Sequence, residues 1–130
     1  MGVCVCGSKK QYSRCCEPLL TGKKKAKTVS QLVRSRYAAY AIGGQAKYLV
    51  QTWHPSTAGN IKAAELNTSN YTWDSLELIG YQQKGDFGKV EFIARYKDAE
   101  GLEQAHHEVS LFQRMKGDWY YVKGQALNQN

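Results

Sequence analysis

The sequence lacks several features that would place the protein in a common class. No apolar run approaches the roughly 20 residues that a membrane-spanning helix needs. The first residues, Met1-Gly2-Val3-Cys4, carry neither a charged n-region nor an apolar h-region, so no signal peptide is visible. Phosphate-binding loops, nucleophile elbows and metalloprotease signatures are also missing. We therefore expect a soluble, cytoplasmic protein that uses none of these catalytic devices.

Cysteine is absent after residue 16. Cys4, Cys6, Cys15 and Cys16 have the spacing C-x-C-x8-C-C, and four thiolates can fill all the positions around a tetrahedral structural zinc ion. Disulfides are the alternative, but they need an oxidising compartment, and adjacent cysteines pair poorly because the bond has strict geometry. The spacing favours a metal-binding knuckle over residues 1–19. Iron competes with zinc for it, since sulfur ligation alone does not choose between them.

The residues between the cysteines favour a compact turn. Gly7 permits a tight backbone turn, and the hydroxyl of Ser8 can cap a short helix over residues 9–14. This helix would carry the last two cysteines back towards the first two. Tyr12 is expected to cover the cluster.

The pattern Cys4-x-Cys6-Gly7-Ser8-x-x-x-Tyr12-x-x-Cys15-Cys16 resembles the SEC-C motif. That motif is the metal-binding knuckle at the C-terminal tail of the bacterial protein-export ATPase. This chain departs from it at Val5, where proline is usual, and has no second glycine after Ser8. Neither position is a ligand, so the resemblance implies metal binding and a docking role towards a protein-export or chaperone component.

Acidic residues are scarce near the N-terminus. Residues 1–27 hold seven basic residues and a single acidic one, whereas residues 28–130 hold eleven basic and ten acidic residues. Concentrated basic charge favours an acidic protein surface, the ribosome or RNA as a partner. The alternative to partner binding is that the charge only keeps a tether solvated. In both cases residues 20–27 are expected to form a flexible linker. The predicted partner-binding residues are Lys9, Lys10, Arg14, Lys23, Lys24, Lys25 and Lys27.

Residues 28–127 predict helices followed by strands. Thr28 and Gln31 form a capping-box pattern at the start of a helix that Gly43-Gly44 ends. A second helix is expected over 45–53, stopped by Pro55, and a third over 57–68. Helices before strands indicate an α+β domain with an antiparallel sheet. The predicted strands are 72–83, 88–97, 102–115 and 119–123.

Five groups of residues in this domain form a recognisable pattern: Arg34-Ser35-Arg36-Tyr37-x-x-Tyr40, Tyr48-Leu49-x-x-Thr52-Trp53-His54-Pro55, Phe92-x-Ala94-Arg95-Tyr96, Glu108-x-Ser110-x-Phe112 and Gly117-x-Trp119-Tyr120-Tyr121-x-x-Gly124. They resemble the YchJ family of uncharacterised bacterial proteins. The resemblance implies a fold similar to nuclear transport factor two, a cone in which a curved antiparallel sheet packs on helices around a cavity. Together with the knuckle it covers nearly the whole chain.

Three residues are candidates for catalysis. Strand alternation places His106 and Glu108 on one face, where they could form an acid/base pair if that face lines the cavity. An ion pair between Glu108 and an arginine, such as Arg36, is the favoured alternative. His54 could act as a base or as a ligand-binding donor. Capping the preceding helix is its favoured role.

The sequence favours a non-enzymatic adaptor that binds zinc or iron and docks through its basic knuckle. The alternative is a small-molecule binder or an enzyme of the hydrolase, isomerase or cyclase type that uses the cone. The outer face of the sheet, around Ile93, could also support a homodimer. A filled aromatic core is the default for the cone's interior. The candidates for lining a cavity are Arg36, Tyr37, Tyr40, Trp53, Arg95, Ser110, Phe112, Trp119 and Tyr121.

Overall fold

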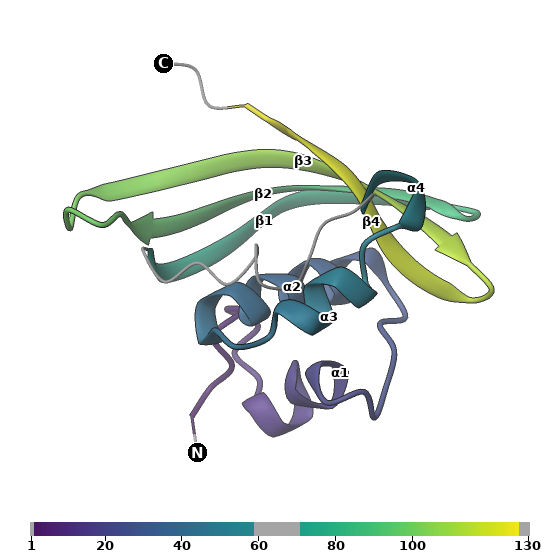
Figure 1. Cartoon of the computed structure of the whole chain (residues 1–130), viewed down its shortest axis with the longest axis horizontal. Coiled ribbons are helices and arrows are strands. Elements are labelled where there is room, and N and C mark those ends of the chain that lie inside the picture. The colour runs from purple at the N-terminus through teal and green to yellow at the C-terminus, as the bar shows by residue number, and fades with distance from the viewer. Residues whose placement is uncertain (1, 59–70, 128–130) are drawn as a thin grey trace.

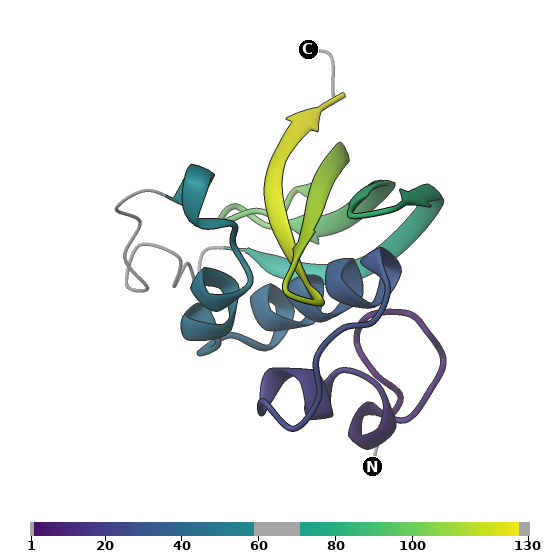
Figure 2. The same cartoon turned by 90° about the vertical axis from the view of Figure 1, so that its right-hand side faces the viewer.

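The computed structural model describes residues 2–58 and 71–127 and has three layers (Figure 1). A four-stranded sheet forms one layer and two helices form the next. The N-terminal segment lies beyond these helices, on the side away from the sheet (Figure 2). The helices are η1 (Tyr12–Arg14, a 3-10 turn), α1 (Glu17–Leu20), α2 (Val29–Ile42), α3 (Ala46–Gln51) and α4 (Pro55–Ala58).

The sheet is a meander of antiparallel neighbours in the order β1-β2-β3-β4. Two-residue turns join the first and last hairpins. Gly85 and Gly117 have φ values of 61° and 88° there, a region that glycine adopts without strain. The α+β class and all four strands are confirmed, with bounds that differ by one to three residues. The strands are β1 (Thr72–Lys84), β2 (Phe87–Lys97), β3 (Glu103–Met115) and β4 (Asp118–Ala126).

Helix α2 covers the concave face of the sheet. Thr28 Oγ1 accepts a hydrogen bond from the amide of Gln31, as the capping pattern predicts, and Gly43 ends the helix at φ 83°. The Gln31 side chain instead accepts from the amide of Lys27, one residue before the cap. The buried side of α2 is the centre of the core. It comprises Val29, Leu32, Val33, Ser35, Arg36, Tyr37, Ala38 and Ala39.

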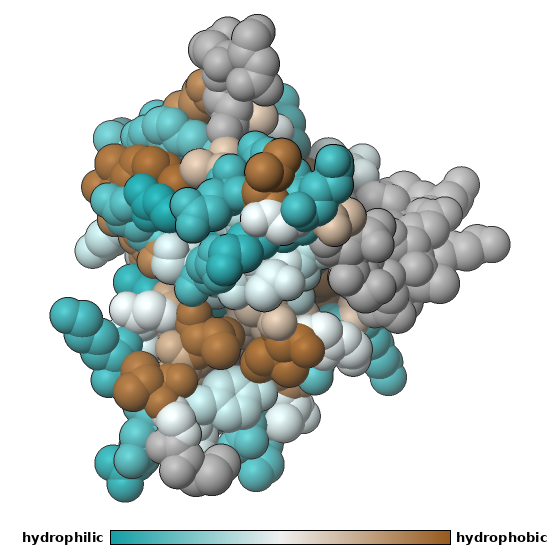
Figure 3. All heavy atoms as spheres, turned by 90° about the vertical axis from the view of Figure 1, so that its left-hand side faces the viewer, coloured by the Kyte–Doolittle hydropathy of each residue, from teal (hydrophilic) through white to brown (hydrophobic). Residues whose placement is uncertain are grey.

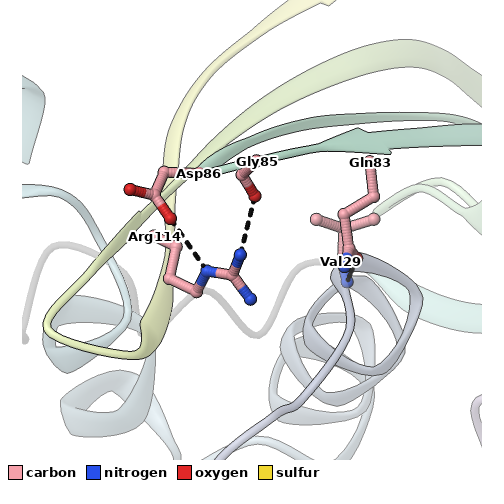
Figure 4. Close-up of polar contacts among 5 residues, drawn as sticks. All are labelled: Val29, Gln83, Gly85, Asp86 and Arg114. Carbon is pink, nitrogen blue, oxygen red and sulfur yellow. Dashed lines mark hydrogen bonds and ion pairs between the residues drawn. The ribbon is translucent and has the colours of Figure 1, made fainter.

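The start of α2 is tied to the first hairpin, as Figure 4 shows. The side chain of Gln83 in β1 accepts a hydrogen bond from the amide of Val29 at 3.3 Å. Arg114 in β3 donates to Asp86 Oδ1 at 3.1 Å and to the carbonyl of Gly85 at 2.8 Å. These contacts hold the β1–β2 turn against its neighbouring strand and position the N-terminus of α2 on the sheet.

The second predicted helix is shorter than expected. Helix α3 ends at Gln51 because the chain turns to follow β4: Thr52 O accepts from the amide of Tyr121, and the amide of His54 donates to Tyr121 O. Pro55 begins α4 rather than stopping α3, which suits proline at a first helical position. The third predicted helix, over 57–68, lies mostly outside the described residues.

The N-terminal segment packs into the same core as the cone. Cys4, Cys6 and Cys16 are buried in one cluster with Leu19 and the inner side of α2. Ala26, inside the predicted flexible linker, is 7% exposed. The knuckle is therefore anchored to the cone by apolar packing, which differs from the free tether that the run of lysines suggested.

The expected helix over residues 9–14 is wrong. Lys9 has φ 71°, outside the helical region, and Val3 pairs with Gln11 in an isolated antiparallel bridge. Only η1 remains helical. A small hairpin forms instead, in which the amide of Cys4 donates to the carbonyl of Lys10 and the amide of Tyr12 donates to the carbonyl of Gly2.

Large apolar side chains on the surface are scattered. Figure 3 shows separate brown groups divided by hydrophilic residues on one side of the molecule. The exposed large apolar side chains are Val3, Val5, Ile42, Tyr71, Ile79, Tyr81, Phe87, Leu102 and Leu111.

None of the helices in the described part of the chain has both the length and the apolar character needed to cross a bilayer.

Candidate metal centre and cone cavity

The knuckle gathers its four thiols into one cluster. The Sγ atoms of Cys4, Cys6, Cys15 and Cys16 all lie within 4.8 Å of one another. Two of the separations, Cys6 to Cys15 and Cys15 to Cys16, are 3.6 and 3.9 Å. A tetrahedral ion with metal–sulfur bonds of about 2.3 Å needs sulfur atoms about 3.8 Å apart. The donor set therefore fits zinc, or iron with sulfur ligation, and none of these cysteines is in a disulfide.

The cluster cannot hold four negative charges without a cation. The neighbouring Cys16 thiol is the main reason that the pKa of Cys6 falls to about 4. The pKa of Cys16 is raised, chiefly because its thiol supports the Cys6 thiolate, and burial raises the pKa of Cys15. One thiolate makes ionisation of the neighbouring thiols unfavourable. Deprotonation of all four thiols would therefore need a bound divalent cation.

Two polar groups support the cluster from outside. The hydroxyl of Ser8, which the sequence predicted to cap a helix, lies 3.1 Å from Cys15 Sγ. Arg34 of α2 donates to the carbonyl of Cys6 at 2.6 Å and lies 4.0 Å from its sulfur. Arg34 therefore offsets thiolate charge and links the knuckle to α2. Sequence reasoning missed this role because the two residues are 28 positions apart.

Gly7 is where the knuckle touches the sheet. Its φ is 82°, and a Cβ there would lie 3.2 Å from the carbonyl oxygen of Leu76 in β1. Both the backbone conformation and the close approach therefore require glycine.

A basic groove runs between the knuckle and the cone. Its lining includes Cys15 and Cys16, and Pro18, Leu19 and Ala26 supply apolar surface. Among the described lining residues the one acidic side chain is Asp118, from the β3–β4 hairpin. Lys9 and Lys23, predicted for partner binding, do not line it. The six cations that do are Lys10, Arg14, Lys24, Lys25, Lys27 and Arg34.

The cone encloses a cavity of about 280 Å³ between α2 and the sheet. Seven of the nine candidate lining residues face it, together with His106 and Glu108. Aromatic rings make up most of the remaining wall. The full lining is Val33, Arg36, Tyr37, Tyr40, Trp53, Tyr71, Trp73, Phe92, Ala94, His106, Glu108, Ser110, Phe112 and Tyr121.

Arg95 and Trp119 were predicted to line the cavity, but neither residue does. Arg95 lies on the other face of β2, where it pairs with Glu77 at 3.1 Å. Trp119 is buried in the core near Gly88, under the guanidinium of Arg114. Strand alternation explains the outward position of Arg95, because its neighbour Ala94, like Phe92, faces the cavity.

His106 and Glu108 are paired inside the cavity. His106 Nε2 lies 2.6 Å from Glu108 Oε1, and the hydroxyl of Ser110 donates to Oε2. The expected ion pair between Glu108 and an arginine is absent from the described residues. Arg36 instead donates to the carbonyl of Leu49.

Gly124 makes room for this pair. It lies opposite Ser110 in β4, and a Cβ at this position would collide with the carboxyl group of Glu108. Burial works to raise the pKa of Glu108, but the hydrogen bonds from His106 and Ser110 outweigh it and the net pKa is lowered. The bond to Glu108 raises the pKa of His106.

His54 lies outside the cavity lining. Its Nδ1 accepts hydrogen bonds from the amide and hydroxyl of Ser56, at 3.0 and 2.8 Å. The imidazole therefore caps the start of α4 and not, as expected, the end of the preceding helix. Its ring also lies edge-on to Tyr120. These contacts are structural.

Comparison with known proteins identifies the family. Residues 28–124 match the family described as the YchJ middle domain, which is similar to nuclear transport factor two. The chain belongs to the YchJ family. UPF0225 protein GSU1048 of Geobacter sulfurreducens is 35% identical over an alignment of 130 positions, which covers 96% of this chain and 80% of that protein.

Solved structures agree with the YchJ family fold. The solution structure of RPA3114 from Rhodopseudomonas palustris, described as a protein containing a SEC-C motif, is 39% identical with a TM-score of 0.90. The match covers 98% of this chain and all of that one. A domain from Exiguobacterium sibiricum, described as a candidate Ca/calmodulin-dependent kinase II association domain, is 14% identical with a TM-score of 0.58. The match covers 78% of this chain and 92% of that one, and it shows the fold alone.

The pairing of His106 with Glu108 predicts a pH dependence for this YchJ-family cone. The raised pKa of His106 means that its contribution to stability is present below 6.5 and is lost as pH rises through the raised value. The lowered pKa of Glu108 means that its contribution is present above 4.5 and is lost as pH falls through the lowered value. Replacing Glu108 with glutamine should lower the pKa of His106, as measured by NMR titration of its ring protons.

Glu77→Gln is the matched control for that titration. Glu77 is an exposed carboxylate paired with Arg95 outside the cavity, so its loss should leave His106 unchanged. An unchanged pKa of His106 in Glu108→Gln would show that the two side chains do not interact in solution.

Proposed function

We propose that the protein is a non-enzymatic adaptor in which a zinc or iron ion fixes the fold of the knuckle, which packs on the cone, and so shapes the basic groove for an acidic partner. The observation that carries this proposal is the makeup of the groove. Cations from three separate segments, together with two of the four metal-ligand candidates, line one surface. Binding the ion would fix the relative positions of Lys10 and Arg14 on one side and Lys24 and Lys25 on the other.

The chemistry of the groove favours an acidic peptide segment over RNA. Proteins that bind single-stranded RNA stack its bases on aromatic side chains, and the described lining of the groove includes none. Pro18, Leu19 and Ala26 supply instead an apolar floor that suits the side chains of a peptide. A protein segment with acidic residues beside one or two apolar ones would pair with the lining cations and pack on the apolar residues of the groove. The partner that we propose is an acidic tail of this composition on a protein-export or chaperone component.

Charge reversal in the groove should weaken partner binding. In Lys24→Glu/Lys25→Glu, two lining cations become anions, so affinity for an acidic peptide should fall at least tenfold at 0.15 M salt and depend less on salt. Fluorescence anisotropy with a labelled peptide of alternating glutamate and leucine measures both quantities. A labelled single-stranded RNA of the same charge is measured in parallel.

Lys9→Glu/Lys23→Glu is the matched control, because it makes the same charge change at two lysines outside the groove lining. It should retain most of the affinity. Equal losses in the two double variants would mean that binding follows net charge and not the groove. Tighter binding of the RNA than of the peptide would also overturn the proposed partner.

A further inference from the structure

The cavity in the cone is a site of a different kind from the groove. Its walls are mostly aromatic, with Tyr37 and Tyr40 of α2 packed around Trp73 at ring-centre distances of 5.9 and 6.1 Å. Tyr71 lies edge-on to the same indole at 6.0 Å. Ligand pockets typically combine such apolar walls with a few convergent polar groups. Here the polar groups are Arg36 of α2 and the β3 residues His106, Glu108 and Ser110.

A positive charge is buried in this wall without a carboxylate of its own. The side chain of Arg36 is 7% exposed. Its guanidinium lies 4.7 Å from the ring centre of Tyr121 and 5.4 Å from that of Trp53. Nη1 donates to the carbonyl of Leu49 and to Thr52 Oγ1. Among the described residues, no hydrogen bond or ion pair occupies Nη2 or Nε.

The nearest acid in the cavity is already engaged. Both oxygens of Glu108 accept hydrogen bonds, one from His106 and one from Ser110. Glu108 therefore directs its hydrogen bonds to His106 and Ser110, and none to Arg36 is found among the described residues. A buried guanidinium whose charge is unpaired is costly, and a small anion in the cavity would pair it.

We propose that the cavity binds a small carboxylic acid with an aromatic or similarly flat apolar body. The carboxylate would accept hydrogen bonds from the unused N–H groups of Arg36, and the body would lie between the aromatic walls. A volume of about 280 Å³ suits a ligand of about a dozen non-hydrogen atoms. This binding uses the cone and is independent of the groove, so either activity can fail without the other.

Phenylacetate and phenylacetamide test this inference, because they differ only in the charge and donor pattern of one end. In two-dimensional NMR titrations of the whole protein, phenylacetate should bind with a dissociation constant below about 1 mM. It should shift the signals of Trp53 and Trp73, which line the cavity. Phenylacetamide should bind at least tenfold more weakly, since it brings no charge to Arg36.

Three variants locate the binding. Arg36→Gln should remove the preference for the acid over the amide. Arg95→Gln makes the same substitution on an exposed arginine outside the cavity and should bind like the natural chain. Ala94→Leu adds three carbons to the cavity wall and should block both ligands without removing any charge.

The inference is overturned if the natural chain binds acid and amide equally, or binds neither, or if Ala94→Leu binds as before. A folded Arg36→Gln that still prefers the acid would also overturn it. Arg36 supports the end of α3 through Leu49 and Thr52, so this variant is checked for folding first. If Arg36→Gln is unfolded, the inference is tested by two measurements: the affinities of the natural chain for the acid and the amide, and ligand binding by Ala94→Leu.

Discussion

Replacing Cys6 with serine should abolish tight metal binding and destabilise the whole domain. Cys6 is fully buried, and its sulfur lies 3.6 Å from that of Cys15 in the cluster. Without it the site keeps three thiols and a hydroxyl, which is a poor ligand for zinc or iron. Because the knuckle and the cone share a core, the loss should reach beyond the knuckle.

The expected loss in the free energy of unfolding is about 3 kcal/mol or more. Structural zinc ions contribute about 10–16 kcal/mol in small zinc-finger peptides, but here the cone supplies its own core. The change would therefore lower stability without unfolding the chain completely. Denaturant unfolding gives the free energy, and elemental analysis of reduced protein gives the metal, with about one ion per chain expected for the natural sequence.

Val5→Ser is the control, because it places the same residue between two of the candidate ligands. Val5 is 45% exposed, so metal content and stability should change little. Natural protein that carries less than half an equivalent of metal and unfolds identically with and without a chelator would show that the cluster is not a metal site.

Replacing Gly124 with alanine should disrupt the polar side of the cavity. The added Cβ would lie 2.9 Å from the hydroxyl oxygen of Tyr121 and in collision with the carboxyl group of Glu108. Glu108 must then move away from His106, or β4 must move away from β3. Forcing extra volume into a packed site costs about 1–3 kcal/mol, and the broken pair adds to it. The expected loss in stability is about 2–4 kcal/mol, with a fall in the pKa of His106.

Gly80→Ala provides the comparison. Gly80 is also in a strand, does not have positive φ, and has no atom within 4 Å of an added Cβ. Alanine there should be close to neutral or slightly stabilising, because it restricts the unfolded chain. Thermal unfolding and the NMR titration of His106 measure the two effects. Equal stability of the two variants would mean that the Glu108 carboxyl group does not pack against Gly124.

The secondary structure was predictable where local chemistry decides it. Thr28 and Gly43 set the ends of α2 by capping, and glycine turns set the hairpins. Predictions failed where a distant contact decides the backbone. Helix α3 ends early because Thr52 and His54 bond to Tyr121 of β4, which lies far along the chain.

The sequence alone determined the four cysteines that could bind a metal ion, the α+β class and the fact that basic charge is concentrated near the N-terminus. These depend on residue types and short spacings, which a one-dimensional pattern preserves. Tertiary structure decided which of these features act together. Arg34 reaches the cysteines, and Lys10 and Lys24 share a groove, because packing of the knuckle on α2 brings distant segments together. Glu108 pairs with His106, so Arg36 has no carboxylate partner among the described residues. Both pairings were possible from the sequence, and the folded geometry determines which one forms.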